Sequence, residues 1–434
     1  MKLVIGPDDR RSSVRRSFFS FRSLCLLLLS IVIAHAGRFG YSCYRKALPP
    51  KSRRFKGFSP SSKEGVNLAG YTRAEMGLGQ AARGMAAALE AIRIPFGIVN
   101  LKVGNYARQT DTSCIDKETR DPNYDITILT INPDNIGNAK LWLPKSLFAD
   151  RYVIGYWVWE LPEIPDTWLQ AFPLLDEVWA ASRFVEEALK AKSPVPVTRI
   201  PHVVKLHDSL ALPRRRLNLP EEQFLFLSMC DASSVMERKN PRGAIRAFQT
   251  AFDKNDARVG LVLKMRDQHP FRRDMAALRQ EIAGWSNIYL LEHALSRHEI
   301  NSLLVATDCF VSLHRSEGFG LAPAEAMSFG KPAIMTRWSG NTDYMTPDNS
   351  VGVDYRLVKL LRDYGPYKAG QVWADPDINQ TADWMKRLAG DRDLAKAIGM
   401  RGQKTIQQEL SPSVVGSLIR NRLLQIREQY CGGR

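Results

Sequence analysis

Apolar residues from about residue 60 onward follow two alternating spacings. Short continuous runs rich in β-branched residues predict buried strands, as in DITILTIN at 125–132 and RYVIGYWVW at 151–159. Helical patterns lie between such runs, as at 80–92 and after Ser182, which is placed to cap a helix. Strands that alternate with helices form parallel sheets covered on both faces, so this region is predicted to be an α/β domain.

The alternation stops once and then begins again. Residues 205–222, KLHDSLALPRRRLNLPEE, are polar and basic and contain two prolines, which predicts a linker. The chain from 383 to 430 is helical by pattern, and strand-like runs separated by helical segments lie at 224–230, 259–265, 288–292, 309–314 and 332–336. The predicted fold class is therefore α/β, with two Rossmann-like doubly wound domains facing a central cleft.

Four segments follow from this pattern. We expect a basic tail with a short apolar segment at 1–58, a first Rossmann-like domain at 59–206 and a second at 207–410. The last segment, 411–434, is expected to be a helix that packs back towards the first domain. Ligands bind at the carboxyl ends of the strands in such sheets, so the residues that follow each strand are the functional candidates.

The composition is that of a globular chain, and its positive charge is unevenly distributed. A length of 434 residues with 44% hydrophobic content suits two or three domains. The net charge is +16, but residues 1–60 hold 13 Lys/Arg against 2 Asp/Glu, while the remainder holds 48 against 43. The folded part is therefore not strongly basic, and we expect no nucleic-acid partner.

An apolar run at 23–37 lies inside the basic tail and is short for a membrane-spanning helix, which needs about 20 residues. Three interpretations stay open: a secretory signal peptide ending in AHA, a membrane-surface anchor, and an upstream stretch outside the working protein. The six cysteines are scattered without the spacing of a disulfide framework, which argues against a secreted protein. They form no C-x-x-C pair, so the sequence gives no support to a zinc or redox site. We expect a cytoplasmic protein with peripheral association to the cytoplasmic membrane face through residues 1–56.

The segment RSEGFGLAPAEAMSFGKP at 315–332 combines two carboxylates with glycines. Glu317 follows the predicted strand 309–314, and Glu325 falls in the first turn of a predicted helix. The uncovered amides around Gly318 and Gly320 suit an anion, and carboxylates accept hydrogen bonds from sugar hydroxyls, so the segment suits a sugar nucleotide. A helix dipole alone also favours acids at a helix N-terminus, but that explanation leaves the glycines unexplained.

The stretch EGFGLAPAE at 317–325 resembles the E-x7-E signature of retaining glycosyltransferases of the GT-B fold, the glycosyl transferases group 1 family. Further similar segments lie at 231–248, 303–341 and 372–377 and in the terminal helix, so the resemblance covers about residues 60–430 and is stronger in the second half. It implies transfer of a hexose from a UDP- or GDP-hexose to a glycan or lipid-linked acceptor, without a cofactor or metal. The first domain would bind the acceptor and the second the donor nucleotide.

The resemblance also implies roles for single residues. Glu325 would bind the ribose hydroxyls, Glu317 would contact the transferred sugar as a catalytic carboxylate, and Lys239 would neutralise the leaving diphosphate. The family's arginine position is occupied by Ser233-Ser234, so Arg238 is the substitute; the alternative for both cations is a solvated basic turn. Sugar and phosphate oxygens would be held by the backbone of Gly318, Phe319, Gly320 and Leu321, with Asn341 lining the cleft beside the donor.

Gly77 and Gly79 mark a strand–helix turn in the first domain. A lone G-x-G is a weak signal for a nicotinamide cofactor, which would also need an acid at the end of the second strand, 95–103, where none occurs. A glycine loop that closes over a diphosphate or an acceptor fits better. A nicotinamide-linked oxidoreductase and a non-catalytic sugar-binding protein nevertheless remain the alternative functions.

The stretch GYWVWELPEIP at 155–165 places Trp159 where the family commonly has a histidine facing the donor sugar. Trp159 would contact the sugar or acceptor, with Glu160 as the nearest polar substitute for the histidine; the alternative is that the tryptophans belong to the core. His202 and His314 are expected to have structural and hydrogen-bonding roles. Asp375 and Asp377 match the D-x-D metal motif of another glycosyltransferase fold. That motif needs a different sheet context, so we predict no metal site here.

Overall fold

A computed structural model describes residues 55–59, 63–105, 107–205, 211–231, 234–266 and 272–431. Residues 54–434 form one compact unit. The basic tail that precedes it, including the apolar run 23–37, lies outside the described residues, as does the part 206–210 of the predicted linker. Within the described ranges, no helix is long and apolar enough to cross a membrane.

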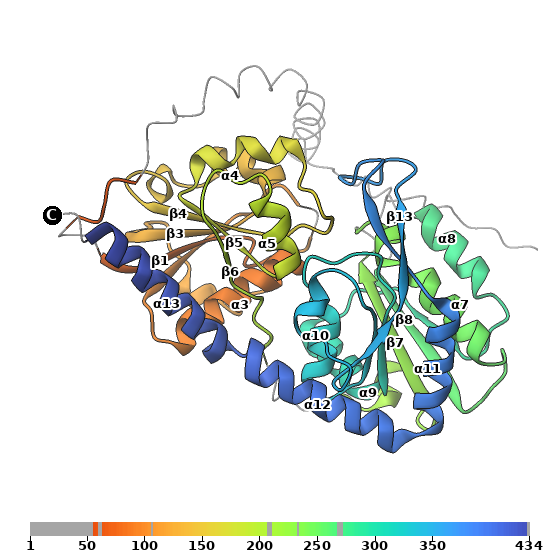
Figure 1. The fold of residues 1–434 in the computed structure, drawn as a ribbon. Coiled ribbons are helices and arrows are strands. Elements are labelled where there is room, and N and C mark those ends of the chain that lie inside the picture. Colours follow the sequence, from red (N-terminus) through yellow and green to blue (C-terminus); the bar gives the residue numbers. More distant parts are fainter. Residues whose placement is uncertain are drawn as a thin grey trace, which may run out of the picture. The chain divides into compact units, whose positions relative to one another are not determined.

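The first half of the chain forms a six-stranded parallel sheet (Figure 1). The order is β2-β1-β3-β4-β5-β6, and the strands are β1 (Lys63–Gly70), β2 (Phe96–Asn100), β3 (Tyr124–Thr130), β4 (Tyr152–Trp157), β5 (Glu177–Ala180) and β6 (Val197–Arg199). The apolar runs that predicted strands at 125–132 and 151–159 become β3 and β4, whose residues are almost all buried. The accompanying α-helices are α3 (Gly77–Ala91), α4 (Ile136–Trp142) and α5 (Arg183–Lys190).

A second six-stranded parallel sheet follows, with the order β12-β11-β10-β7-β8-β9. Its strands are β7 (Phe224–Asp231), β8 (Val259–Arg266), β9 (Ile288–Leu291), β10 (Cys309–Ser312), β11 (Ala333–Thr336) and β12 (Val351–Val353). Its helices are α6 (Met236–Lys239), α7 (Pro241–Ala251), α8 (Arg272–Glu281), α9 (Arg297–Ala306), α10 (Leu321–Ser328) and α11 (Ile378–Gly390). Two Rossmann-like α/β domains are therefore present, and the predicted fold class is confirmed.

An antiparallel hairpin interrupts this alternation between β12 and α11. It consists of β13 (Tyr355–Lys359) and β14 (Val372–Pro376), paired in register from Tyr355 opposite Pro376 to Lys359 opposite Val372. The sequence pattern did not predict it. Short 3-10 turns lie at Ile115–Lys117, Pro133–Asn135, Lys145–Leu147, Asp166–Gln170, Phe172–Leu174, Arg214–Leu217 and Gly340–Asp343.

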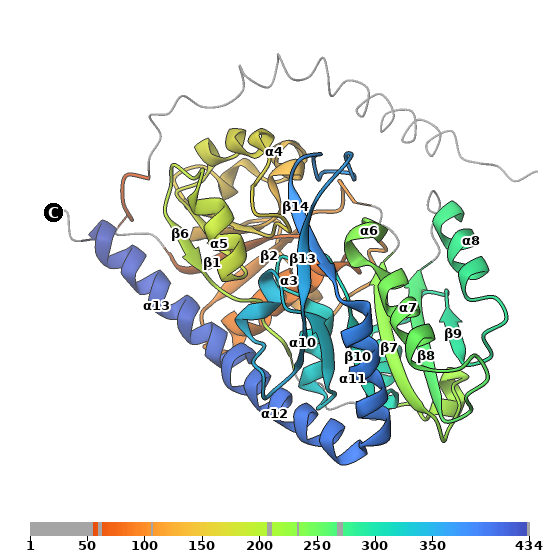
Figure 2. The same ribbon diagram turned by 45° about the vertical axis from the view of Figure 1, so that its right-hand side comes forward.

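The chain ends in two long helices, α12 (Arg392–Leu410) and α13 (Pro412–Cys431). Helix α13 packs against α3 of the first domain (Figure 2). Arg422 of α13 forms a bidentate pair with the fully buried Glu177 of β5, with both N–O distances at 2.8 Å. Arg427 pairs with the buried Asp125 at 3.0 Å. The last helix is thus fixed to the first domain by charge as well as by apolar packing.

The folded part begins a few residues before the predicted boundary at 59. The Phe55 amide donates to Asp176, and the Phe55 ring lies edge-on to Tyr152 and Tyr430, with centroids 5.5 and 5.2 Å away. Phe58 packs on Phe55 at 4.8 Å. Phe55 and Phe58 are therefore partly buried against the hydrophobic core, so the segment 55–58 packs on the folded part.

Candidate active site

The loop between β10 and α10 carries Glu317 and is held by both domains. Gly320 has a φ of +83°, the left-handed conformation that glycine tolerates, and it is the N-cap residue of α10. A Cβ on Gly318 would come within 2.4 Å of the Val158 side chain and 2.9 Å of the Trp159 carbonyl. The Ser182 hydroxyl, which caps α5 as predicted, also donates to the Gly318 carbonyl at 2.6 Å. The first domain thus fixes the backbone of the glycine loop.

Glu317 is paired with both predicted cations. Its Oε1 lies 2.5 Å from Lys239 Nζ, and its Oε2 lies 3.3 Å from Arg238 Nη1. Burial alone would raise the pKa of Glu317, but the two cations outweigh burial and lower this pKa to about 2. The carboxylate is therefore fully ionised at neutral pH, and the structure brings together the three residues expected to act in catalysis.

Local structure explains why the cations face Glu317. Asn240 adopts a left-handed conformation between α6 and α7, and its side chain accepts from the Gly243 amide at 3.1 Å, capping α7. The Asn240 amide group also donates to the Leu313 carbonyl at 2.8 Å. This bond fixes the end of α6 beside the loop that follows β10, so Lys239 lies next to the acid.

Arg238 is the most enclosed member of this group, with 4% of its surface exposed. Its Nη1 donates to the Ser316 carbonyl at 2.7 Å, and its Nη2 lies 3.7 Å from Glu160 Oε1. Burial would lower the pKa of the guanidinium, but the neighbouring carboxylates raise it, so the group stays charged. Its Nε has no hydrogen-bond partner among the described residues.

Trp159 and Glu160 end up in different surroundings although they are neighbours in sequence. Trp159 is 2% exposed, donates to the Glu163 carbonyl at 2.7 Å and packs on Trp168, with centroids 4.9 Å apart. The expected contact of this ring with a sugar or acceptor is not supported, because it has no exposed face; the core interpretation fits. Glu160 instead joins the charged group around Arg238.

Glu325 lies on α10 and is 6% exposed. Its Oε1 accepts from Arg297 Nη2 at 2.7 Å. Arg297 is the first residue of α9, whose N-terminus is fixed by a capping box between Ser296 and Glu299. Arg297 was not expected at the site, because it lies outside the segments that carry the resemblance.

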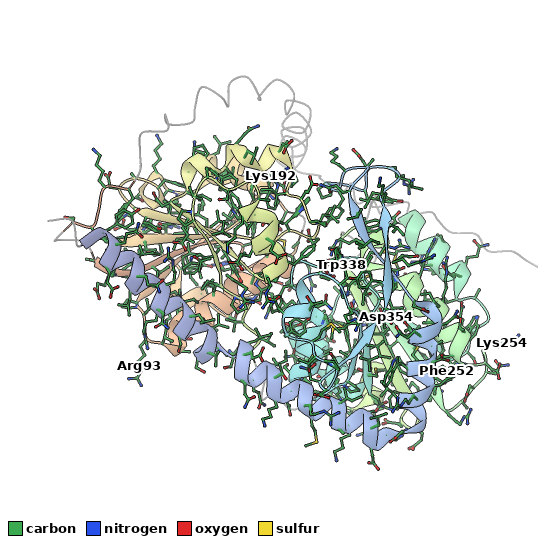
Figure 3. All side chains as sticks on the ribbon, in the orientation of Figure 1. Arg93, Lys192, Phe252, Lys254, Trp338 and Asp354 are labelled. Atoms are coloured by element: carbon green, nitrogen blue, oxygen red, sulfur yellow. The ribbon has the colours of Figure 1, made fainter. Side chains whose placement is uncertain are left out.

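The segment after β11 supports the Glu317 loop through hydrogen bonds. The Glu317 amide donates to Ser339 Oγ at 2.8 Å, and the Gly340 amide donates to the Glu317 carbonyl at 2.9 Å. Trp338, labelled in Figure 3, packs its ring on Phe184 of the first domain, with centroids 5.6 Å apart. Ser339, in the segment expected to line the cleft beside the donor, thus supports the loop that carries Glu317.

Asn341 and Phe319 are buried in this support. Asn341 is completely buried, its Oδ1 lies 2.9 Å from His314 Nε2, and its Nδ2 donates to the Thr336 carbonyl at 2.9 Å. Phe319 is 2% exposed and packs on His202. Burial lowers the pKa of His314, which agrees with a neutral ring in a hydrogen-bond chain. These side chains hold the loop, and the donor contacts expected of the Phe319 backbone and of Asn341 stay predictions.

The chain is similar to known proteins in part of its sequence and in its fold. The model of the family "Glycosyl transferases group 1" matches residues 212–357. The chain carries a glycosyl transferases group 1 domain. This domain contains Lys239, Glu317 and Glu325, and it confirms the predicted enzyme class, a glycosyltransferase. No curated protein matches the chain.

Solved structures similar to the whole unit confirm the GT-B fold that the group 1 domain implies. HepE from Anabaena, in complex with UDP and glucose, is 14% identical with a TM-score of 0.58, over 84% of this chain and 100% of that one. Sucrose-phosphate synthase from Thermosynechococcus elongatus is 15% identical with a TM-score of 0.59, over 84% and 99%. A glycosyltransferase from Rickettsia africae is 14% identical with a TM-score of 0.57, over 86% and 100%.

Two predicted donor contacts lie outside the group 1 domain, at the start of α3. A Cβ on Gly79 would meet the Ala74 carbonyl at 2.0 Å, so this glycine is required by close backbone packing. A Cβ on Gly77 would meet nothing within 4 Å. Gly77 therefore leaves backbone open to a ligand, whereas Gly79 shapes the turn; their donor contacts stay predictions.

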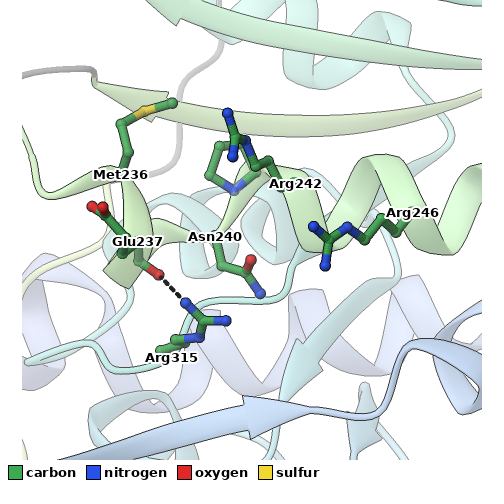
Figure 4. Close-up of a pocket in the computed structure, with 7 residues that line it drawn as sticks. Met236, Glu237, Asn240, Arg242, Arg246 and Arg315 are labelled. Carbon is green, nitrogen blue, oxygen red and sulfur yellow. Dashed lines mark hydrogen bonds between the residues drawn. The ribbon is translucent and has the colours of Figure 1, made fainter. Parts of the chain in front are cut away.

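A cavity of about 250 Å³ adjoins α6 within the group 1 domain (Figure 4). Its lining includes Arg242, Arg246 and Arg315, and Arg315 donates to the Glu237 carbonyl. Arg242 also pairs with Glu281, and Arg315 with Asp375. No predicted catalytic or donor residue lines this cavity. Among the described residues, no group of three or more His, Cys, Asp or Glu side chains could hold a metal.

Proposed function

We propose that the protein transfers a hexose from a UDP- or GDP-hexose to a glycan or lipid-linked acceptor, with retention of configuration. The observation that carries the proposal is the contact of Glu317 with Lys239 and Arg238 inside the group 1 domain. At such a site a bound anion can replace the buried carboxylate as the partner of the two cations. The similar HepE structure holds UDP and glucose, which supports a nucleotide sugar as the donor.

The cations would act on the leaving diphosphate. Without a donor, Lys239 and Arg238 both pair with Glu317; with a donor, the diphosphate oxygens would compete for the same ammonium and guanidinium. The bond between the sugar C1 and the diphosphate oxygen breaks, and the acceptor oxygen bonds to C1 on the same face. The acceptor proton passes to the departing phosphate oxygen. The protein then needs to stabilise the charge on the diphosphate rather than to supply a separate base.

The remaining residues of the site would bind the donor. Glu325 would accept from the ribose hydroxyls with the oxygen that Arg297 does not occupy. The amides of Gly318 to Leu321 would face the sugar and phosphate oxygens at the start of α10, where the helix dipole favours an anion. Glu317 would contact hydroxyls of the transferred sugar once the diphosphate replaces it on Lys239.

We also propose that the reaction needs no metal, because the two cations that pair with Glu317 would meet the charge of the diphosphate instead. Activity should therefore persist in excess EDTA. An activity that is lost in EDTA and restored by Mg²⁺ or Mn²⁺ would contradict this.

The acceptor and location belong to the same proposal. Residues 1–56 carry most of the net positive charge, which would bring the enzyme to the anionic cytoplasmic membrane face and to a lipid-linked acceptor. A protein beginning at residue 55 should sediment less with vesicles containing anionic lipid than the full chain does. Equal sedimentation would contradict the role of the tail.

Nucleotide binding tests the donor assignment separately from turnover. Calorimetry with UDP and GDP should show binding of at least one of them to the wild type. Glu325→Ala should weaken that binding roughly tenfold or more, because hydrogen bonds to a charged group contribute about 1.5–3 kcal/mol. Glu187→Ala, an exposed carboxylate on α5, is the matched control and should bind as the wild type does. Unchanged affinity in Glu325→Ala would remove Glu325 from the site, and NAD binding instead of UDP or GDP would favour the oxidoreductase alternative.

A further inference from the structure

The β13–β14 hairpin connects the second domain to the core of the first. Leu360, Tyr367 and Trp373 belong to the same hydrophobic cluster as Trp157 and Trp159 of the first domain. A polar contact accompanies this packing, since the Gln371 side chain donates to the Glu163 carbonyl at 3.2 Å. The hairpin extends beyond the segment matched by the family model, which ends at residue 357 within β13. None of its functional contacts was expected from the sequence.

Tyr367 is the hairpin residue that reaches the charged group. Its hydroxyl donates to Glu160 Oε2 at 3.0 Å, and its ring lies 5.4 Å from that of Trp159. Only 4% of its surface is exposed. Burial raises the pKa of Tyr367 well above its ordinary value, so the phenol stays protonated and remains a donor at neutral pH.

Tyr367 and Glu160 together flank Arg238. The guanidinium lies 5.7 Å from the centre of the Tyr367 ring, within the range of a cation–π contact. The second oxygen of Glu160 lies 3.7 Å from Arg238 Nη2, on the side of the guanidinium that Nη1 does not use for Ser316 and Glu317. A 3.7 Å contact is long for a hydrogen bond, so the direction of the Glu160 carboxylate matters for it.

We propose that Tyr367 is a positioning residue: its hydroxyl fixes Glu160, and Glu160 with the Tyr367 ring holds the Arg238 guanidinium towards Glu317 and the diphosphate site. The orientation of Arg238 would thus depend on the packing of the β13–β14 hairpin against the first domain. Two acceptors on opposite sides restrain a flexible arginine, and losing one of them frees the side chain to rotate. The catalytic consequence rests on the proposed transferase function, whereas the restraint on Arg238 does not.

Tyr367→Phe removes only the hydroxyl and keeps the ring, so it tests the bond to Glu160 with little effect on packing. The matched control is Tyr364→Phe, in the same hairpin, whose ring packs on Trp373 and Arg362 and which pairs with Tyr367 only through its backbone. The restraint can be read without any substrate. Modification of Arg238 by phenylglyoxal, followed by peptide mass spectrometry, should be several-fold faster in Tyr367→Phe than in the wild type or Tyr364→Phe. Equal rates in all three proteins would overturn the proposal.

Kinetics test the consequence for catalysis. Tyr367→Phe should lower kcat roughly tenfold with little change in the donor KM, since a hydrogen bond to a charged group is at stake. Glu160→Ala should already remove this effect, so the double variant should be no slower than Glu160→Ala alone. Independent, multiplicative losses would indicate a merely structural tyrosine and overturn the proposal. A wild type that releases no nucleotide from any nucleotide sugar would refute the proposed function instead, and the phenylglyoxal rates would still decide the restraint.

Discussion

At the level of single residues, the Lys239 ammonium is expected to serve two anions in turn, Glu317 at rest and the diphosphate during transfer. Because the diphosphate gains charge as it leaves, Lys239→Ala should lower kcat by roughly 10²–10³, about 3–4 kcal/mol. Lys239→Arg should recover only part of this loss, since a planar guanidinium does not reproduce a point charge. Steady-state rates of nucleotide release measure both. Lys190→Ala, a surface lysine on α5 paired with Glu186, is the control. A wild-type kcat in Lys239→Ala would refute the role.

The lowered pKa of Glu317 predicts that the protein loses stability in acid. Its pKa is lowered from 4.5 in the unfolded chain to about 2 in the folded protein. A depressed carboxylate pKa contributes stability above the unfolded value, and the contribution disappears as pH falls from about 4.5 towards 2. The contribution is on the order of 3 kcal/mol at neutral pH. Urea unfolding of the wild type and Glu317→Gln between pH 7 and pH 3 should show the stability gap narrowing below about pH 4.5. A gap that stays constant with pH would contradict the shifted pKa.

The resemblance identified Glu317, Lys239 and Arg238, but it did not identify the residues outside the matching segments that contact this group. Glu317, Lys239 and Arg238 followed from the resemblance, and the structure joins them directly. Tyr367 lies 207 residues from its partner Glu160, and no periodicity links the two. The orientation of Trp159 was also out of reach, because a ring after a strand can face either the core or the cleft.

At the level of secondary structure elements, the start of α10 depends on Gly320. The backbone at residue 320 has a φ of +83°, which strains any residue with a side chain. A Cβ added there would lie 2.7 Å from the Tyr344 hydroxyl. Gly320→Ala should therefore lower the free energy of unfolding by about 1–3 kcal/mol, measured by denaturant titration. Gly284 shares a φ of +81° but has nothing within 4 Å of such a Cβ, so Gly284→Ala isolates the backbone strain. Equal losses in the two variants would show that contact with Tyr344 has no cost.

Elements with continuous apolar runs were predictable, whereas the hairpin was not. Strands β3, β4 and β8 lie inside their sheets between parallel neighbours, and burial on both faces requires unbroken hydrophobic sequence. Strand β13 has the sequence YRLVK with exposed Arg356 and Leu357, so its pattern resembles a polar loop. Its structure comes from pairing with β14 and from the contacts of the hairpin with the first domain.

At the level of the whole molecule, α13 secures the first domain through a buried ion pair. Arg422 is the bidentate partner of Glu177, which is completely buried. Arg422→Ala would leave that carboxylate without its cation, so the free energy of unfolding should fall by about 3–5 kcal/mol. Lys190→Ala breaks an exposed pair on α5 and should cost at most about 0.5 kcal/mol. Similar small losses in both variants would show that the C-terminal helix is not needed for stability.

The two-domain architecture was predictable from the alternation of strands and helices. The predicted linker at 205–222 lies between β6, in the first sheet, and β7, in the second. The start of the folded part was placed too late, because Phe55 and Phe58 precede the first strand and carry no periodic pattern. Their packing on Tyr152 and Tyr430 involves the far end of the chain, which local sequence cannot indicate.

The proposed reaction moves a hexose from a nucleotide-diphosphate donor. The most direct test is to incubate the full chain with UDP-hexoses and GDP-hexoses in excess EDTA and to measure the nucleotide diphosphate released. We predict release from donors of one nucleotide class by the wild type, and a loss of roughly 10²–10³ in rate for Lys239→Ala at saturating donor. Release from no donor, or equal release by the wild type and Lys239→Ala, would contradict the claim.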